Sequence, residues 1–315
     1  MFDAEKFIKE TVEQLKKDIT GKALIAFSGG VDSTVCAALV NKAIGKRLIA
    51  VHVDTGYMRK NESSNVEKLM KKMDLNYRFV DASKEFYTAL KGVKDPEKKR
   101  KIIGEKFIRV FEKIAEKEEI EYLVQGTIAP DWIESGDNLR DNIKSHHNVG
   151  GLPEHMKLKL VEPLRDLYKD EVRKVARALK LPVSERQPFP GPGLAVRIIG
   201  EASPERVEIV REACDIVEKE IESAVEKGLM ELPWQYFAVL LPIKSVGVQG
   251  DRRAYGYVIA IRAVQSIDAM TCAFSKIPDE VIDRISTRIT NTLKDTVNRV
   301  VYDVTNKPPG TVEWE

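Results

Sequence analysis

Cysteine is scarce in this chain, and its placement excludes two classes of site. The only cysteines among the 315 residues are Cys36, Cys214 and Cys272, which are far apart and show no C-x-x-C spacing. An odd and dispersed set gives no disulfide framework, and no pair has the spacing of a thiolate zinc site. We therefore expect the cysteines to be buried packing residues.

Long apolar runs and an excess of one charge are absent as well. No stretch approaches the roughly 20 residues of a membrane span, and the chain is charged from Asp3 onward without the apolar core of a signal peptide. Lys and Arg number 51 against 49 Asp and Glu, and we expect the basic run 98–101 to be a solvated helix start. The sequence predicts a cytoplasmic protein that binds neither nucleic acid nor membrane.

What is present is an alternation of strand and helix patterns in the first half. Short apolar runs alternate with helical periodicity after an amphipathic entry helix from Phe7 to Ile19. The runs are at 23–27, 48–53, 77–80 and 122–124, and the longest helical pattern spans 96–118. Such alternation predicts an α/β fold, a parallel sheet covered on both faces.

The length predicts a second domain. A helix over 169–179 is followed by P-F-P-G-P-G at 188–193, which cannot continue a helix or a central strand. We place the boundary there, giving domains 1–187 and 188–315. The second shows a helix from the N-cap Ser203 to about 227, strands at 236–241, 257–264 and 300–304, and a helix over 279–293. This pattern predicts a small α+β domain.

The most informative string is S-G-G-V-D-S at 28–33, set between an apolar run and a helical pattern. A strand, a glycine turn and a helix start in this order present backbone N–H groups and the helix dipole to an anion, which favours phosphate. A bare glycine turn is a common connector, so the prediction depends on the full hexapeptide in this context. The string is not a Walker A loop, and it resembles the PP-loop of the ATP pyrophosphatases.

The resemblance implies an ATP site at the carboxyl edge of the sheet. The expected ATP-binding residues are Ser28, Gly29, Gly30, Val31, Asp32 and Ser33 in the loop and Val53, Gln125 and Gly126 at neighbouring strand ends. From 127 to about 159 the pattern becomes polar, glycine-dotted and rich in groups that bind anions or move protons. We expect this segment to be a mobile lid over the site.

The later motifs, in their order, resemble the GMP synthetase family, specifically its ATP pyrophosphatase subunit. The motifs include T-I-A-P-D-W-I-E-S, K-S-H-H-N-V-G-G-L-P, P-F-P-G-P-G-L and N-K-P-P-G-T-V-E-W-E. The resemblance covers nearly the whole chain. It implies adenylation of xanthosine monophosphate (XMP) by ATP with Mg²⁺, followed by amination to GMP with release of AMP. No cysteine lies in a G-x-C-x-G elbow, so ammonia is expected from a separate glutamine amidotransferase (glutaminase) subunit.

Family positions imply two sets of site residues. The catalytic set is Asp131, Glu134, Lys144, His146, His147, Lys169, Asp170 and Arg173, with Asp32 and Asp170 as the Mg²⁺ contacts. The substrate set is Arg186, Gly191, Pro192, Gly193, Gln249, Gly250, Lys307 and Glu313. The adjacent histidines point to opposite sides of an extended segment, so at most one faces substrate, and they lack the spacing of a metal pair. Lys169, Asp170 and Arg173 read without the family are ordinary first-turn charges.

The chain departs from the family pattern at three positions. Gln187 stands where many members have histidine, while Ala254 and Gly256 replace a threonine and an aspartate. We do not expect direct substrate contacts there.

The segment 257–262 predicts a homodimer. Its apolar side chains lie on both faces of the expected strand, which is more apolar surface than a small domain can cover alone, so we expect a dimer through the second domain.

Two other functions stay open. One is a different amidating or thiolating PP-loop enzyme, such as NAD synthetase or a tRNA sulfur transferase. The latter needs a reactive thiol, for which Cys36 is the candidate by position. The other is a nucleotide-binding module without turnover, which the charged and proton-transferring groups of 127–159 disfavour.

Overall fold

The computed structural model describes residues 2–130, 158–182, 187–249, 251–266 and 270–315, and the chain forms two compact units. The first unit contains residues 1–54, 61–82 and 104–186, and the second contains 55–60, 83–103 and 187–315. Both units are therefore discontinuous in sequence. The loop 55–60 leaves the first unit after a strand and belongs to the second.

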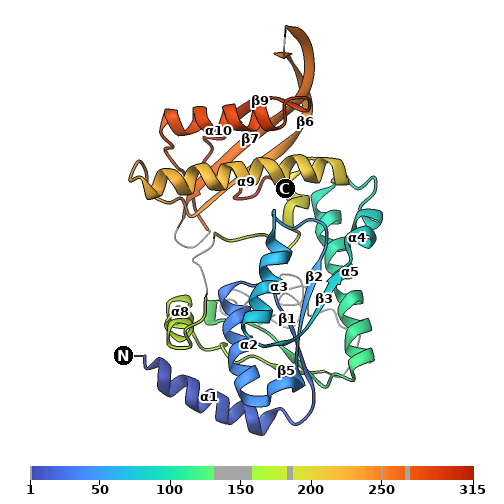
Figure 1. Cartoon of the computed structure of the whole chain (residues 1–315), viewed down its shortest axis with the longest axis vertical. Coiled ribbons are helices and arrows are strands. Elements are labelled where there is room, and N and C mark those ends of the chain that lie inside the picture. Colours follow the sequence, from blue (N-terminus) through green and yellow to red (C-terminus); the bar gives the residue numbers. More distant parts are fainter. Residues whose placement is uncertain (1, 131–157, 183–186, 250, 267–269) are drawn as a thin grey trace. The chain divides into compact units, whose positions relative to one another are not determined.

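The first unit is built on a five-stranded parallel sheet, as the alternating pattern predicts (Figure 1). Its strands are β1 (Ala23–Ala26), β2 (Leu48–Asp54), β3 (Asn76–Asp81), β4 (Tyr122–Val124) and β5 (Lys159–Val161), in the order β3-β2-β1-β4-β5. Strand β1 is central, with Ala23 level with Leu48 on one side and Tyr122 on the other. The loop that follows β1 therefore lies at the middle of the carboxyl edge.

Helices cover this sheet and bury its aliphatic side chains. They are α1 (Ala4–Asp18), α2 (Val31–Ile44), the short η1 (Gly45–Arg47), α3 (Glu62–Lys72) and α8 (Lys169–Ala178), while α5 (Pro96–Glu118) begins in the second unit and continues into the first. The Asp3 carboxylate caps α1 by accepting from the backbone N–H groups of Glu5 and Lys6. None of the described helices is long and apolar enough to cross a membrane.

The second unit combines a mixed sheet with two long helices. Its elements are α4 (Ser83–Ala89), η2 (Gly193–Arg197), α9 (Pro204–Glu226), β6 (Gln235–Gln249), β7 (Arg252–Gln265), β8 (Ala273–Phe274), α10 (Asp279–Thr292) and β9 (Val297–Tyr302). β7 pairs antiparallel with β6 and β8 and parallel with β9. Helix α9 begins as predicted, with the Ser203 hydroxyl accepting from Arg206 N and Pro204 in the first turn.

Two strands of this sheet are longer than the sequence indicates. The predicted strands 236–241 and 257–264 become β6 and β7, which continue as a hairpin to the turn near Asp251. Their register shifts between Leu240 and Lys244, around Pro242, because proline cannot donate a ladder hydrogen bond.

The apolar stretch of β7 is covered inside its own unit. Every side chain from Val258 to Val264 is buried without a partner chain, Arg262 included. The alternation on this strand is therefore a wrong reason to expect a dimer, because the unit covers both faces of the strand itself.

Candidate active site

The glycine loop Ser28-Gly29-Gly30 joins β1 to α2. Gly29 has φ +78°, and a Cβ there would lie 2.8 Å from Val66 Cγ2 on α3, so a side chain is excluded by both conformation and space. Gly30 is the N-cap of α2 and supplies no capping side chain. Since the first N–H groups of a helix have no intrahelical acceptor, the start of α2 is open to an anion.

Hydroxyl groups line the same turn. The oxygens Ser28 Oγ and Ser33 Oγ lie 3.0 Å apart, and Ser33 Oγ also donates to Gly30 O at 3.1 Å. Ser28 Oγ accepts from Gly30 N at 3.3 Å. These contacts hold the two predicted phosphate-binding serines against each other across the loop.

Asp32 and Lys169 meet although they are far apart in the chain. Lys169 Nζ, at the first residue of α8, donates to Asp32 Oδ2 at 2.5 Å. The other carboxylate oxygen, Asp32 Oδ1, is buried and has no hydrogen-bond partner among the described residues. The pair therefore places one cation and one spare carboxylate oxygen beside the glycine loop.

The other predicted residues of α8 lie on its exposed surface. Asp170 Oδ2 accepts from Lys174 Nζ at 3.2 Å, and this hydrogen bond lowers the pKa of Asp170. Arg173 is one turn beyond Lys169 on the helix and is exposed. The structure thus joins Lys169 with Asp32 and ties Asp170 to its own helix.

The predicted strand ends adjoin the loop. Gly126, just beyond β4, packs against α2: a Cβ there would lie 3.3 Å from Asp32 Cβ. Gln125 N donates to Val161 O at 2.9 Å, and its carbonyl accepts from Cys36 Sγ at 3.6 Å. Val53 is buried near the end of β2. These contacts bring the end of β4 against the first turn of α2.

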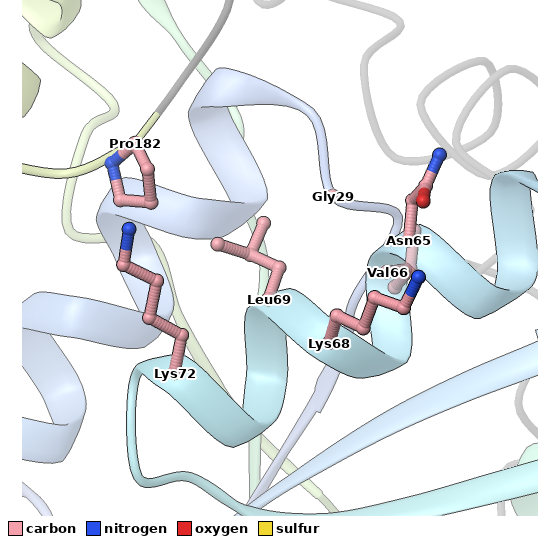
Figure 2. A pocket seen from close by; sticks show the side chains of 7 residues that line it. All are labelled: Gly29, Asn65, Val66, Lys68, Leu69, Lys72 and Pro182. Carbon is pink, nitrogen blue, oxygen red and sulfur yellow. The ribbon is translucent and has the colours of Figure 1, made fainter.

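A groove of about 200 Å³ flanks the loop on the side of α3. Figure 2 shows Lys68 and Lys72 on α3 with Leu69 between them and Gly29 in the loop above. Asn65, Val66 and Pro182 complete its lining, which contains no acidic residue. The groove adds positive charge to the surroundings of the loop.

Close to the glycine loop, a buried histidine links the end of β1 to α3. His52 on β2 contacts Phe27 O through Nδ1 at 2.9 Å and Ser63 Oγ through Nε2 at 3.2 Å. Burial lowers the pKa of His52, so the ring is neutral, with Nδ1–H as the donor to the carbonyl. His52 thereby fixes the end of β1 to the first turn of α3.

The predicted substrate residues of the second unit are divided between η2 with its preceding turn, the segment 303–315 and the far end of β6. Gly193 opens η2 at φ +64°, where a Cβ would lie 2.3 Å from Tyr57 O, and Leu194 N donates to that oxygen at 2.8 Å. Gly191 and Pro192 precede it in the connecting turn. Lys307 pairs with Cys272 through both backbone groups. Gln249 is the last residue of β6.

Glu313 is already bound by side chains of its own unit. Arg197 donates to both carboxylate oxygens at 2.9 and 3.1 Å, and Gln235 Nε2 donates to Oε1 at 2.9 Å. Gln187 also bonds within this unit, donating to Glu218 at 3.0 Å and accepting from Tyr236 N at 2.8 Å. Sequence reasoning missed Arg197, which is the last residue of η2 and follows shortly after the P-F-P-G-P-G segment.

The expectation that the basic run 98–101 is solvated is only partly correct. Lys98 and Lys101 are exposed, but Lys99 is fully buried and donates to Ala195 O at 3.0 Å and Ile198 O at 2.7 Å. Its ammonium also pairs with the Glu315 carboxylate. The prediction of a solvated run is wrong for Lys99, because carbonyls from a distant segment replace water around it.

Several predicted site residues lie outside the described residues. They are Asp131, Glu134, Lys144, His146, His147, Arg186 and Gly250.

The cysteines are buried, as the sequence predicts. Burial raises the pKa of Cys36 well above its usual range and that of Cys214 to about 11. Because the thiolate is the reactive form, Cys36 is unsuited to sulfur transfer.

Comparison with known proteins agrees with these features. Residues 222–314 match the family described as GMP synthase C terminal domain, and residues 22–187 match Queuosine biosynthesis protein QueC. The chain is 59% identical over 319 aligned residues to the B subunit of GMP synthase [glutamine-hydrolyzing] from Methanopyrus kandleri, covering 100% of both chains.

Two further relatives extend the comparison. The corresponding B subunit from Thermoplasma acidophilum is 56% identical over 98% of both chains. GMP synthase [glutamine-hydrolyzing] of Thermotoga petrophila is 56% identical over 98% of this chain but only 62% of that relative. With this identity to full-length relatives, the chain belongs to the family of GMP synthase B subunits.

Proposed function

We propose that this chain catalyses both chemical steps that convert XMP to GMP. The C2 oxygen of XMP attacks the α-phosphorus of ATP as a neighbouring ring nitrogen loses its proton, and the bond to the β-phosphate breaks, releasing pyrophosphate. Ammonia then attacks C2, the C2–O bond breaks, and AMP leaves with that oxygen while the nitrogen loses a proton. The observation that carries this proposal is the uncapped start of α2 behind the glycine loop, with Lys169 and Asp32 beside it.

The chain's own groups suit charge neutralisation at the pyrophosphate. The N–H groups at the start of α2 and the hydroxyls of Ser28 and Ser33 would hold the β and γ phosphates. Lys169 would move from Asp32 to the phosphate oxygens as negative charge develops on the leaving group. Positioning and electrostatics are the main contributions a protein makes to such displacements.

Mg²⁺ fits this site at Asp32. Asp32 Oδ1 is buried and unpartnered among the described residues, and magnesium favours one or two carboxylates completed by phosphate oxygens and water. When bound, Mg²⁺ would supply positive charge to the pyrophosphate. Asp170, the second predicted contact, would first have to leave its ion pair with Lys174.

The ammonia would come from a separate glutaminase subunit. The relatives are named as the B subunit of a glutamine-hydrolysing enzyme, which implies a partner polypeptide. The described cysteines are buried and lie outside any nucleophile elbow, so none is placed to attack glutamine. The lid over 127–159, its catalytic residues and the cytoplasmic location stay predictions of the sequence.

We also propose a homodimer, on evidence different from the sequence argument. Val246 and Val248 on β6 and Tyr255 on β7 share one face of the hairpin and are 44%, 77% and 67% exposed. A two-fold partner is the commonest way to cover such a surface. Light scattering should give twice the chain mass, and Val248→Glu should give the monomer; a monomeric unmodified chain would contradict the proposal.

Product analysis tests the proposed chemistry. The purified chain is incubated with ATP, MgCl₂ and XMP, and with ammonium or glutamine as the nitrogen source. We expect GMP, AMP and pyrophosphate in equal amounts with ammonium and none with glutamine. ADP as the nucleotide product, or ATP cleavage that does not depend on XMP, would contradict the proposal.

A further inference from the structure

Among the described residues of the second unit, three cations are fully buried and belong to no predicted site: Arg197, Lys99 and Arg262. Arg197 and Lys99 are the two that bind carboxylates of residues 313–315. Arg197 is 1% exposed and Lys99 is 0% exposed. Burying an unpaired charge is strongly unfavourable, so each of these cations must be surrounded by acceptors. For Arg197 and Lys99, the acceptors include a carboxylate of residues 313–315.

Arg197 binds the Glu313 carboxylate through two of its nitrogen atoms. Its Nε and Nη2 donate to the two carboxylate oxygens, a bidentate contact that fixes both the position and the plane of the carboxylate. The guanidinium is itself clamped, with its central carbon 4.0 Å from the ring centroid of Phe237 and 5.2 Å from that of Phe189. Lysine could replace the charge at this position but not the paired geometry.

Gln235 ties the same carboxylate to the P-F-P-G-P-G segment. Its Nε2 donates to Glu313 Oε1 at 2.9 Å and to Pro188 O at 3.1 Å. Arg197 Nη1 and Gln235 Oε1 are buried and have no partner among the described residues. One donor and one acceptor therefore remain beside Glu313.

Lys99 anchors the next carboxylate along the chain. Its ammonium pairs with Glu315 while binding Ala195 O and Ile198 O, and Gly200 N donates to Glu315 Oε1 at 3.1 Å. Arg100 also donates to Glu315 O. The short segment 195–200 thus holds both Glu313 and Glu315.

We infer that Arg197 and Lys99 are positioning residues that present Glu313 to the purine ring of the substrate nucleotide. This inference rests on the proposed function, in which Glu313 accepts from N–H groups of XMP. A buried ion pair is weak evidence for stability, and its better-attested use is to fix one arrangement of a segment. Here the fixed segment contains Glu313, the residue predicted to bind the purine.

The test measures KM for XMP and for ATP separately in Arg197→Lys and Glu315→Gln, at saturating ammonium. Misplacement of a binding group by about 1 Å commonly costs up to about 100-fold, so we expect KM for XMP to rise at least about 10-fold in Arg197→Lys. KM for ATP should stay unchanged. Glu315→Gln keeps the size of the side chain, so it remains informative if Arg197→Lys does not fold. Arg284→Lys, which alters a half-exposed ion pair with Glu220, is the matched control.

The outcomes separate this inference from the proposed function. Unchanged KM for XMP in folded variants, or equal rises for XMP and ATP, would overturn the positioning role. If the unmodified chain makes no GMP, the proposed function fails, and hydrogen exchange of 303–315 then decides. Faster exchange there in Arg197→Lys, with the rest of the unit unchanged, supports anchoring of this segment by Arg197; equal exchange refutes the anchoring and with it the positioning role.

Discussion

The Lys169–Asp32 pair of the first unit and the buried cations Arg197 and Lys99 of the second unit are held in opposite ways. In the first unit, the side chains of Lys169 and Asp32 are 45% and 29% exposed and form a single ion pair. In the second unit, the side chains of Arg197 and Lys99 are almost completely buried and surrounded by fixed acceptors. Exposed pairs can exchange partners at little cost, whereas buried pairs cannot. The first site is therefore suited to changing contacts during a reaction, and the second to holding one arrangement.

The largest expected effect is on the rate, at the exposed pair. In the proposed mechanism, Lys169→Ala and Asp32→Ala each remove a charged group that acts on the leaving pyrophosphate, Lys169 directly and Asp32 through Mg²⁺. We expect adenylation to slow about 100-fold, equivalent to about 3 kcal/mol of transition-state stabilisation. The measurement is XMP-dependent pyrophosphate release under single-turnover conditions. Arg177→Ala removes a charge from the same helix and serves as the control; near-normal rates in the first two variants would exclude them from the mechanism.

Stability should show the reverse order. Lys99→Met removes the buried ammonium that pairs with Glu315 and binds two backbone carbonyls, which should lower the free energy of unfolding by about 3 kcal/mol. Lys169→Met breaks an exposed pair and should cost less than about 1 kcal/mol. Urea unfolding of both variants, with Lys98→Met as an exposed neighbour control, measures the difference. Equal losses of unfolding free energy in Lys99→Met and Lys169→Met would contradict the contrast between the buried and the exposed pair.

A smaller effect concerns the pH dependence of stability. The first unit contains a buried titratable side chain, His52. Its pKa is lowered by burial, so between that pKa and about 6.5 the unfolded chain binds more protons than the folded chain. Stability from His52 is therefore present near pH 7 and falls as the pH drops through this window. His52→Asn keeps a donor for Phe27 O but does not titrate. We expect this variant to lose less stability than the unmodified chain between pH 7 and pH 5 in urea unfolding. Parallel pH profiles would contradict the assignment.

The smallest expected effect is at Cys36. Its thiol is buried in α2 and its pKa is raised, so the thiolate form is not available for chemistry. Cys36→Ala should therefore keep the rate of GMP formation unchanged. Loss of activity in a variant with unchanged thermal stability would revive the sulfur-transfer alternative.

The contrast between the units also explains what could be predicted from the sequence. The glycine loop and its flanking strand and helix are local, so residues 23–44 were sufficient to predict them. The helix at 169–179 was predicted from periodicity, but its contact with Asp32 spans 137 residues and follows only from the packing of α8 beside α2. Family position indicated Lys169, and the fold supplied its partner.

The buried cations were not predictable in the same way. Lys99 has basic neighbours on both sides, and a run of this kind normally stays in water. Its burial depends on carbonyls of 195–198 and on Glu315, which are brought to it by tertiary folding. The hairpin strands were underestimated for a similar reason: Gly247, Gly256 and Pro242 weaken the local strand pattern, and pairing between β6 and β7 overrides it.

The central claim is that the C2 oxygen of XMP becomes bonded to the α-phosphorus of ATP. The most direct measurement follows that oxygen, using XMP labelled with ¹⁸O at C2 together with ATP, MgCl₂ and ammonium. Because amination breaks the C2–O bond, the account predicts one ¹⁸O atom in the phosphate of the product AMP, detected by ³¹P NMR or mass spectrometry. Unlabelled AMP formed alongside GMP would contradict adenylation of the purine.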